Sequence, residues 1–238
     1  MNLNVIGFVE SCYIDKFATP RQPGLVPSSQ AFIRLKPEFQ PQDSLQGLEE
    51  FSHLWVIFLF HKNSVGSRFH AKVHPPRLGQ EKVGVFSTRS PHRANPLGLS
   101  LVKIDSITNE GVWVSGIDLI EGTPVVDLKP YLQYAESIPE AKSGWAQSPP
   151  TKVFAVQITC HEKLAKWKLQ RPNIEALIRE TLCFDPRPEV YKGFEGEESP
   201  YRQNHAMRLF EGDLQFRYPS PQIVEIFDIH FKNDEFQE

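Results

Sequence analysis

The amino-acid sequence predicts a mainly β protein, with an antiparallel or mixed β-barrel in its N-terminal part and a small α+β domain after it. The first half contains short apolar runs, rich in Val, Ile and Phe, that turn residues separate from one another. Helical patterns do not alternate with these runs, which argues against a doubly wound nucleotide-binding fold. At residues 133–150 the composition shifts to Pro, Ser, Ala and Gly, which indicates an arm or linker.

The first half is predicted to consist of strands, with one short helix at residues 44–51. The predicted strands are residues 5–9, 31–35, 54–60, 83–86, 99–107, 112–120 and 124–128. The sequence TNEG at 108–111 supplies a tight turn, so the strands on either side of it are expected to form a hairpin.

The second half is predicted to begin with a strand at 152–159 and a helix at 162–169. A second helix follows the Pro at 172, because apolar residues recur there at helical spacing through residue 182. Two runs, 206–217 and 223–231, are expected to form a closing hairpin. The predicted domains are therefore residues 1–150, with the arm at 133–150, and residues 151–238.

Length and composition exclude several classes of protein. The chain has 238 residues, 40% of them apolar, and a net charge of −3, so its surface as a whole does not favour polyanions. No apolar run approaches the roughly 20 residues of a membrane span, and the N-terminus lacks a signal-peptide pattern. The three cysteines are too scattered for a disulfide framework or a zinc knuckle. We expect a cytoplasmic protein without membrane contact.

One segment departs from this acidic balance. Between residues 61 and 93, Glu81 is the only acid, whereas basic residues recur throughout. Such a run forms either an ordinary solvated face or a local phosphate-binding surface.

Familiar catalytic motifs do not occur in the sequence, since no Gly-rich phosphate loop, Walker sequence or nucleophile elbow is present. His70 and His74 have the spacing of metal ligands on a helix, but they lie in a Pro-bounded loop without a third ligand, so no metal is expected. Cys160 and His161 are adjacent and would point to opposite faces of a strand, which excludes a direct thiol–imidazole pair.

Loops dense in Gly, Pro and polar residues lie between the apolar strands, where a rigid scaffold presents a site. These loops and their flanks resemble, in order and spacing, the recurrent motifs of the YaeB-like (TrmO-type) family. The matching segments are 20–24 (PRQPG), 51–55 (FSHLW), 60–61, 75–79 (PPRLG), 88–100, 122–131 and 185–188 (DPRP).

This resemblance implies a homodimeric β-barrel enzyme that uses S-adenosylmethionine to methylate tRNA. The implied substrate is the threonylcarbamoylated adenosine next to the anticodon, and the methyl group goes to its N6 nitrogen. By position, the implied cofactor-binding residues are Gln22, Pro23, Gly24, Phe60, His61, Arg89, Leu99, Glu121, Gly122, Thr123 and Pro124. This sequence departs from the family pattern at Glu121, where aspartate is expected, and at Ala94, where proline is expected.

The residue types suit such a cofactor. We assign Arg89 to its carboxylate, because a guanidinium pairs bidentately with it, although Arg21 or Arg93 would serve equally. Glu121 is expected to accept the ribose hydroxyls, and an apolar pair, Leu99 and Pro124, is expected to cover the adenine faces.

The candidate proton acceptors or orienting groups are His61, His92, Asp127 and Tyr131, and the sequence does not choose among them. The predicted contacts to the tRNA anticodon loop are Arg68, Lys72, Arg77, Arg93 and Arg187. Two alternatives remain open: a non-catalytic RNA-binding or S-adenosylmethionine-sensing module on the same fold, and a methyltransferase for a small molecule or a protein. The basic segment favours RNA over the second of these.

Overall fold

The computed structural model describes residues 3–62, 69–79, 81–187, 194 and 204–232. The chain divides into two compact units, each assembled from several segments. The first unit comprises Met1–Glu10, Phe32–Val114 and Gly122–Pro149. The second comprises Ser11–Ala31, Ser115–Glu121 and Pro150–Glu238. Two segments of the predicted first domain therefore belong to the same compact unit as the C-terminal residues.

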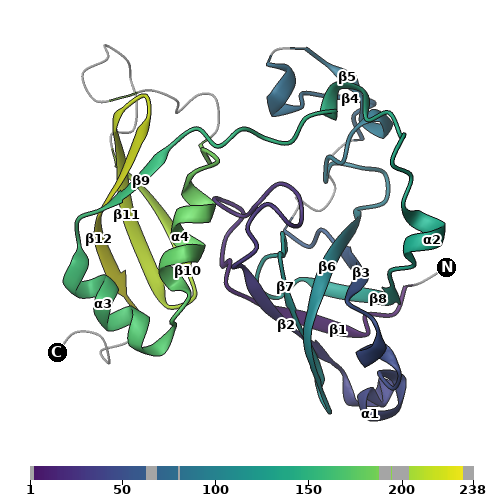
Figure 1. The fold of residues 1–238 in the computed structure, drawn as a ribbon. Helices are drawn as coiled ribbons and strands as arrows, with labels where there is room; N and C mark the ends of the chain where they lie inside the picture. Colours follow the sequence, from purple (N-terminus) through teal and green to yellow (C-terminus); the bar gives the residue numbers. More distant parts are fainter. Residues whose placement is uncertain (1–2, 63–68, 80, 188–193, 195–203, 233–238) are drawn as a thin grey trace. The chain divides into compact units, whose positions relative to one another are not determined.

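The strands of the N-terminal part close into a barrel in the order β1–β2–β7–β6–β3–β8, which confirms the predicted β-barrel (Figure 1). Their bounds are β1 Gly7–Ser11, β2 Gln30–Leu35, β3 His53–Leu59, β6 Leu97–Thr108, β7 Gly111–Ser115 and β8 Pro124–Pro130. The predicted hairpin at 108–111 is present as the β6–β7 connection. Along β3, Leu54, Val56 and Phe58 are buried, and the residues between them are half-buried. This alternation places one face of β3 in the barrel core.

The barrel core requires a glycine on β6. Gly98 pairs with Phe58 of β3, and a Cβ atom at position 98 would overlap the phenyl ring. The absence of a side chain thus leaves the space into which the Phe58 ring packs.

Three predicted elements of the first half differ in the structure. The helix predicted at 44–51 is replaced by α1 (Pro41–Ser44) and a 3₁₀ helix (Leu48–Glu50), because Gly47 interrupts it with a φ of 85°. The strand predicted at 112–120 ends at Ser115, since Gly116 has a φ of 72°. The strand predicted at 83–86 is reduced to β5 (Val83–Gly84), which pairs with β4 (Lys72–Val73), and then becomes a 3₁₀ turn. A positive φ is incompatible with continuing either a helix or a strand.

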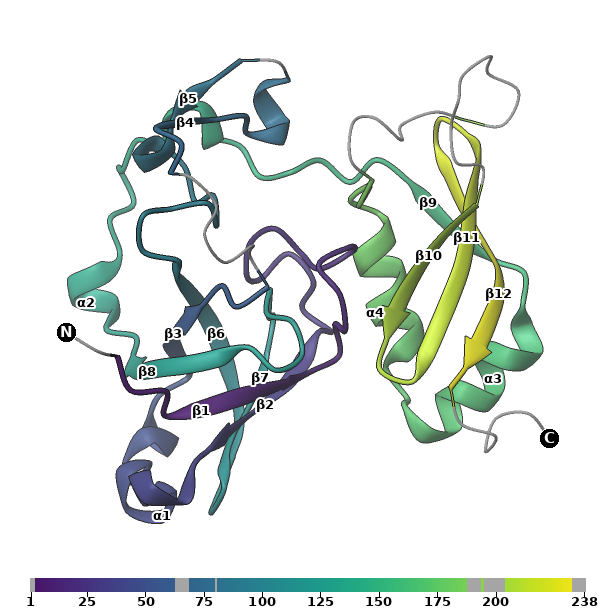
Figure 2. The ribbon, with the colours of Figure 1, turned by 180° about the vertical axis from the view of Figure 1, so that it is seen from behind.

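The C-terminal part is an α+β fold, as predicted. A four-stranded sheet has the order β10–β11–β12–β9, and β9 runs parallel to β12 (Figure 2). The bounds are β9 Ala155–Ile158, α3 His161–Gln170, α4 Ile174–Leu182, β10 Asn204–Leu209, β11 Gly212–Ser220 and β12 Ile223–Phe231. The buried side chain of Trp167 on α3 meets Phe231 of β12 with ring centroids 5.5 Å apart, so aromatic packing joins this helix to the sheet.

The predicted closing hairpin is wrong in one respect. Its first arm, 206–217, is divided into β10 and β11 by a turn at Phe210 and Glu211, where Phe210 has a φ of 51°. The following Gly212 lies against the indole ring of Trp167, and a Cβ atom there would crowd that ring. The arm predicted at 133–150 contains α2 (Gln133–Glu136) and a 3₁₀ turn (Gly144–Ala146). Within the part of the chain that the structure describes, no helix is long and apolar enough to cross a membrane.

Candidate functional site

Strand pairing brings two predicted site residues together on the first unit. Ile57, two residues before the end of β3, pairs with Leu99 on β6 and with Asp127 on β8. Directly opposed residues on neighbouring strands place their side chains on the same face of a sheet. Leu99 is 52% exposed, so this cross-strand row lies on the outside of the barrel. A predicted adenine-contacting residue and a candidate proton acceptor therefore share one surface.

Asp127 sits beside an irregularity in the β3–β8 ladder. The register shifts between Ile57 and Phe58, whose partner is Val125, so β8 holds an extra residue there. Such a bulge redirects neighbouring side chains. The Asp127 carboxylate accepts the main-chain N–H of Leu128 at 2.9 Å and lies 2.9 Å from the Lys129 ammonium. These contacts hold the carboxylate in place.

Phe60 and His61 follow the end of β3. The Phe60 N–H donates to the Pro96 carbonyl at 2.8 Å, which extends the β3–β6 pairing past Leu59. The Phe60 ring makes an edge contact with Phe58, with centroids 5.1 Å apart. His61 is exposed in the turn that follows. Phe60 and Leu99 thus stand near the same end of the β3–β6 pair.

The turn before β8 is held by main-chain hydrogen bonds to β1. Gly122, with a φ of 72°, donates its N–H to the Val9 carbonyl at 2.8 Å, and the Val9 N–H donates to the Thr123 carbonyl at 3.0 Å. Thr123 is buried, whereas Pro124 is half-buried at the start of β8. The tight turn requires the left-handed conformation that glycine adopts without strain.

Four other predicted cofactor residues, Gln22, Pro23, Gly24 and Glu121, lie in the second unit. The N–H of Gly24, which has a φ of 78°, donates to the Gly116 carbonyl at 2.8 Å. The Gln22 side-chain amide donates to the carbonyl of Arg21 at 2.5 Å, and Glu121 Oε2 accepts the N–H of Ser11 at 2.6 Å. The roles of Gln22, Pro23, Gly24 and Glu121 in cofactor binding stay predictions.

The basic segment of the first unit is folded on itself. Arg93 donates to the carbonyls of Thr88, at 2.8 Å, and Val85, at 3.3 Å, and its guanidinium lies 5.7 Å from the centroid of the Phe86 ring. Phe86 is 78% exposed. Other basic residues of the described part of this segment are exposed: Lys72, Arg77, Lys82 and Arg89. Arg68 lies outside the described residues.

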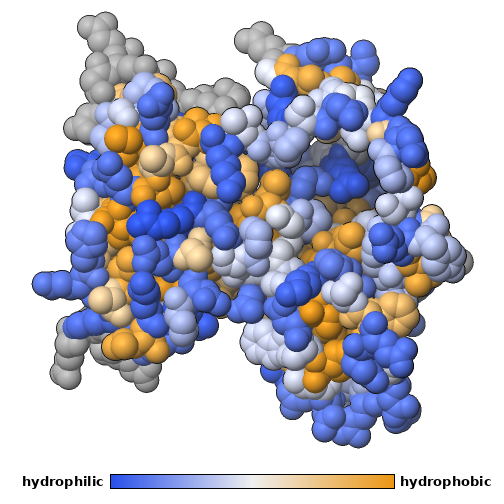
Figure 3. Space-filling view, in the orientation of Figure 1, coloured by the Kyte–Doolittle hydropathy of each residue, from blue (hydrophilic) through white to orange (hydrophobic). Residues whose placement is uncertain are grey.

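The predicted arm lies against this basic segment. The indole N–H of Trp145 donates to the Ser87 carbonyl at 3.0 Å, and Arg77 donates to the Ser148 carbonyl at 2.6 Å. Figure 3 shows the surface of the first unit hollowed beside this part of the chain, with hydrophilic residues around the hollow.

Comparisons with known proteins show the family of the chain. The tRNA-methyltransferase O N-terminal domain family matches residues 8–137, and the TrmO C-terminal domain family matches residues 151–232. The chain belongs to the TrmO family. It is 37% identical to the RcsF protein of Pseudomonas aeruginosa over 96% of this chain and 97% of that protein. It is 43% identical to the tRNA (adenine(37)-N6)-methyltransferase of Escherichia coli K12 over 80% of this chain and 83% of that protein.

The fold also matches a solved structure of the TrmO family. The crystal structure of TrmO from Pseudomonas aeruginosa superimposes with a TM-score of 0.78, at 33% identity, over 97% of this chain and 98% of that chain. The family resemblance and the barrel architecture expected from the sequence are therefore confirmed.

Within this TrmO fold, the four candidate proton acceptors are not at one place. The N–H of Tyr131 donates to the His53 carbonyl at 3.0 Å, whereas Asp127 faces Ile57, four residues farther along β3. At about 3.3 Å per residue, Tyr131 is ~13 Å along the strand from the Asp127 row. His92 is exposed in the basic segment, and its main-chain N–H donates to Ser90 Oγ at 3.2 Å. The geometry groups Asp127 with Leu99 and separates Tyr131 from both.

Arg187 is placed differently from the prediction. It is only 2% exposed, and its guanidinium forms an ion pair with Asp185, at 2.8 Å, and lies 3.3 Å from the Tyr218 ring centroid. A guanidinium buried in this way does not present its donors to a phosphate. The predicted RNA contact at Arg187 therefore does not fit the structure. The sequence DPRP is typical of an exposed loop, but its arginine side chain is buried.

The described residues contain no group of three or more His, Cys, Asp or Glu that could hold a metal ion. Burial raises the pKa of the Cys12 thiol to about 12, and burial also raises the pKa values of Cys160 and Cys183. None of these thiols is thereby activated as a nucleophile, since the thiolate is the reactive form.

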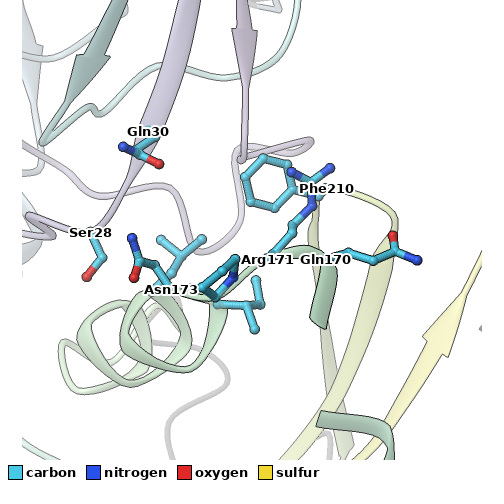
Figure 4. Close-up of a pocket in the computed structure, with 9 residues that line it drawn as sticks. Ser28, Gln30, Gln170, Arg171, Asn173 and Phe210 are labelled. Carbon is cyan, nitrogen blue, oxygen red and sulfur yellow. The ribbon is translucent and has the colours of Figure 1, made fainter. Parts of the chain in front are cut away.

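The second unit also contains a small cleft of about 170 Å³ that sequence reasoning missed (Figure 4). Ser28 and Gln30 contribute from one segment, and Asn173 contributes from the start of α4. Phe210 and Arg171 also line it, with the Arg171 guanidinium 3.7 Å from the Phe210 ring centroid. These residues are far apart in the sequence, so no local motif signals that they meet.

Proposed function

We propose that this chain transfers a methyl group from S-adenosylmethionine to the N6 nitrogen of adenosine 37 in tRNA. The observation that carries this proposal is the 43% identity, over 80% of the chain, to a tRNA (adenine(37)-N6)-methyltransferase. The outer face of the barrel around Leu99 and Asp127 is the supporting structural feature. The activity named for that relative favours a methyltransferase over a sensor module.

The residues of the first unit suit the parts of the cofactor. Leu99 and Pro124 offer apolar surface to an adenine ring, and Phe60 lies near the same end of β3 and β6. The exposed Arg89 is assigned to the cofactor carboxylate. The cofactor supplies an already activated methyl carbon.

Bound S-adenosylmethionine would supply a methyl carbon open to attack by N6, with the sulfur keeping the electron pair of the broken carbon–sulfur bond as S-adenosylhomocysteine. The protein aligns the nucleophile and carbon at roughly 3 Å. The N6 proton must also leave. We assign its acceptance to Asp127 or His61, since Asp127 shares the row of Leu99 and His61 follows Phe60.

The basic segment is proposed to contact the anticodon loop. Lys72, Arg77 and Arg93 would hold phosphates, since cations that face few acids attract the RNA backbone. Phe86 is exposed beside Arg93 and would stack on an unpaired base.

We further propose that the chain works as a cytoplasmic homodimer. The arm at 133–150 supports a clasping contact, because Tyr134 is 88% exposed and Ile138 is 65% exposed. Sedimentation should show a dimer at micromolar concentration, and a monomer would remove this part of the proposal.

The function is tested by methyl incorporation from labelled S-adenosylmethionine into two tRNA preparations, with and without the threonylcarbamoyl group at adenosine 37. Label in the first preparation alone is expected, which would establish both the reaction and the need for that group. Equal label in both would remove the substrate requirement. Label in neither, despite measured cofactor binding, would contradict tRNA methylation.

A further inference from the structure

The segment that carries the predicted cofactor turn begins with a main-chain contact to the C-terminal fold. The Phe210 N–H, in the β10–β11 turn, donates to the Cys12 carbonyl at 2.9 Å, and Tyr13 forms an antiparallel bridge with Leu209. Cys12, Tyr13 and Leu209 are at most 1% exposed. Figures 1 and 2 both show this segment beside α4. The segment and the C-terminal fold therefore share a core.

Beyond this bridge, residues 14–29 form turns and bends without helix or strand. Besides main-chain hydrogen bonds such as that from Gly24 to Gly116, side-chain contacts hold this segment. The Asp15 carboxylate forms a bidentate ion pair with Arg208 on β10, whose Nε donates to Oδ2 at 2.6 Å and whose Nη2 donates to Oδ1 at 2.7 Å. Phe17 stacks on Phe216 of β11 with centroids 6.2 Å apart. A parallel pair of hydrogen bonds fixes direction as well as distance.

A second anchor lies on the other side of the turn. The Ser28 N–H donates to Glu180 Oε2 on α4 at 2.9 Å. The Ser29 hydroxyl donates to the carbonyls of Val26, at 2.7 Å, and Ile117, at 3.2 Å. The predicted cofactor turn at 22–24 is thus flanked by Asp15–Arg208 before it and by Ser28–Glu180 after it.

We propose that Arg208 and Glu180 are positioning residues for S-adenosylmethionine: they belong to the C-terminal fold and hold the turn of Gln22, Pro23 and Gly24 in its cofactor-binding conformation. This inference rests on the proposed function, because it takes the turn as part of the cofactor site. It assigns the C-terminal fold a role in cofactor affinity. Neither residue touches the reacting atoms.

The exposure of the ion pair separates this role from a purely structural one. The Arg208 and Asp15 side chains are 36% and 40% exposed, and an ion pair of that exposure adds little to global stability. The same ion pair still limits the conformations of residues 14–29, which form no helix or strand. Removing it should lower the fraction of molecules with the turn correctly formed and leave the fold intact.

The first test compares Arg208→Ala with Arg217→Ala. Arg217 is a matched control, because its side chain is 44% exposed and pairs with Glu225 at 2.7 Å on the same sheet. If Arg208→Ala lowers the fraction of molecules with the cofactor-binding turn correctly formed to about a tenth, it should raise the KM and the Kd for S-adenosylmethionine about tenfold. The kcat at saturating cofactor should stay near wild type. Arg217→Ala should change neither constant, and Arg208→Lys should restore part of the affinity.

Glu180 provides an independent pair of variants. Glu180→Ala removes the acceptor of the Ser28 N–H and should raise the Kd for S-adenosylmethionine, whereas Glu180→Gln keeps an acceptor oxygen and should bind nearly as wild type. Equal affinities of wild type, Arg208→Ala and Glu180→Ala would overturn the proposal.

Hydrogen exchange distinguishes this proposal from the proposed function. Arg208→Ala should accelerate amide exchange in peptides covering residues 16–27, and Arg217→Ala should not, whatever the methyl acceptor is. If cofactor affinity falls in Arg208→Ala but the wild type methylates no tRNA, the acceptor is wrong and the positioning role stands. If the wild type binds no S-adenosylmethionine, both proposals fall. Unchanged exchange in Arg208→Ala would also overturn the positioning role.

Discussion

Two arginines of the basic segment and two arginines of the second unit have different kinds of hydrogen-bond partner. In the basic segment of the first unit, Arg77 and Arg93 donate to main-chain carbonyl oxygens. In the second unit, Arg187 and Arg208 pair with carboxylates. A carbonyl group orients a guanidinium without neutralising it, whereas a carboxylate cancels its charge. A count of basic residues therefore does not show where RNA binds, because the partner of each arginine decides whether its charge remains available.

The largest expected effect is at Arg187. Replacement by Ala leaves the Asp185 carboxylate, 13% exposed, without its cation and should lower the free energy of unfolding by about 3–5 kcal/mol. Urea unfolding measures this. Arg217→Ala, which breaks an exposed ion pair, should cost about 1 kcal/mol or less. Similar losses for the two variants would mean that burial does not separate the two kinds of arginine.

Next is Phe86, at the surface of the basic segment. Phe86→Ala should weaken tRNA binding by about 1–3 kcal/mol if the ring stacks on a base. The melting temperature should hardly change, because the ring is 78% exposed. Trp113→Ala, at an aromatic residue that is 43% exposed on β7, is the control and should leave tRNA affinity unchanged. Equal loss in both variants would indicate a non-specific effect.

A smaller effect is expected for the charge of Arg77. The logarithm of tRNA affinity falls linearly with the logarithm of salt concentration, and Arg77→Ala should reduce the slope by about 1 if Arg77 contacts one phosphate. Arg217→Ala should leave the slope unchanged, since Glu225 neutralises that arginine. Affinity that does not depend on salt between roughly 50 and 200 mM would contradict the RNA surface.

The smallest effect concerns acid stability of the second unit. Burial alone would raise the pKa of Glu211, but hydrogen bonds from Arg171 and Trp167 outweigh it and hold the pKa below the ordinary value of 4.5. Because the pKa of Glu211 is lower in the folded state than in the unfolded chain, its ionised carboxylate stabilises the fold at pH values above the unfolded-state pKa. This stabilisation is lost as the pH falls through the folded-state pKa. Melting temperatures should therefore depend less on pH below 4.5 in Glu211→Gln than in wild type. The same pH dependence in both proteins would contradict this.

The spacing of apolar residues predicted those helices and strands that bury one face. The helix expected after the Pro at 172 is α4, because apolar residues at helical spacing bury one face of it. The barrel strands were predicted from short apolar runs, since their alternation reflects burial on one side. The break between β10 and β11 was missed, because Phe210 and Glu211 are not turn-forming residues and the turn is imposed by packing around Trp167.

Long-range contacts explain what the sequence did not show at the site. Arg208 and Asp15 are 193 positions apart, so no spacing pattern connects them. The burial of Arg187 was also hidden, because the aromatic ring of Tyr218 that covers it lies on β11, 31 positions later in the sequence. The pairing of Leu99 and Asp127 with Ile57 required the strand order and the register, which the runs alone do not specify.

The most direct test of the account is to locate the methyl group. A tRNA carrying threonylcarbamoyladenosine at position 37 and a matched tRNA with guanosine at that position would each be incubated with the protein and S-adenosylmethionine, digested to nucleosides and analysed by mass spectrometry. We predict that the modified adenosine gains one methyl group at N6 and that the guanosine tRNA gains none. Methylation of both tRNAs, or of a nucleoside other than adenosine 37, would contradict it.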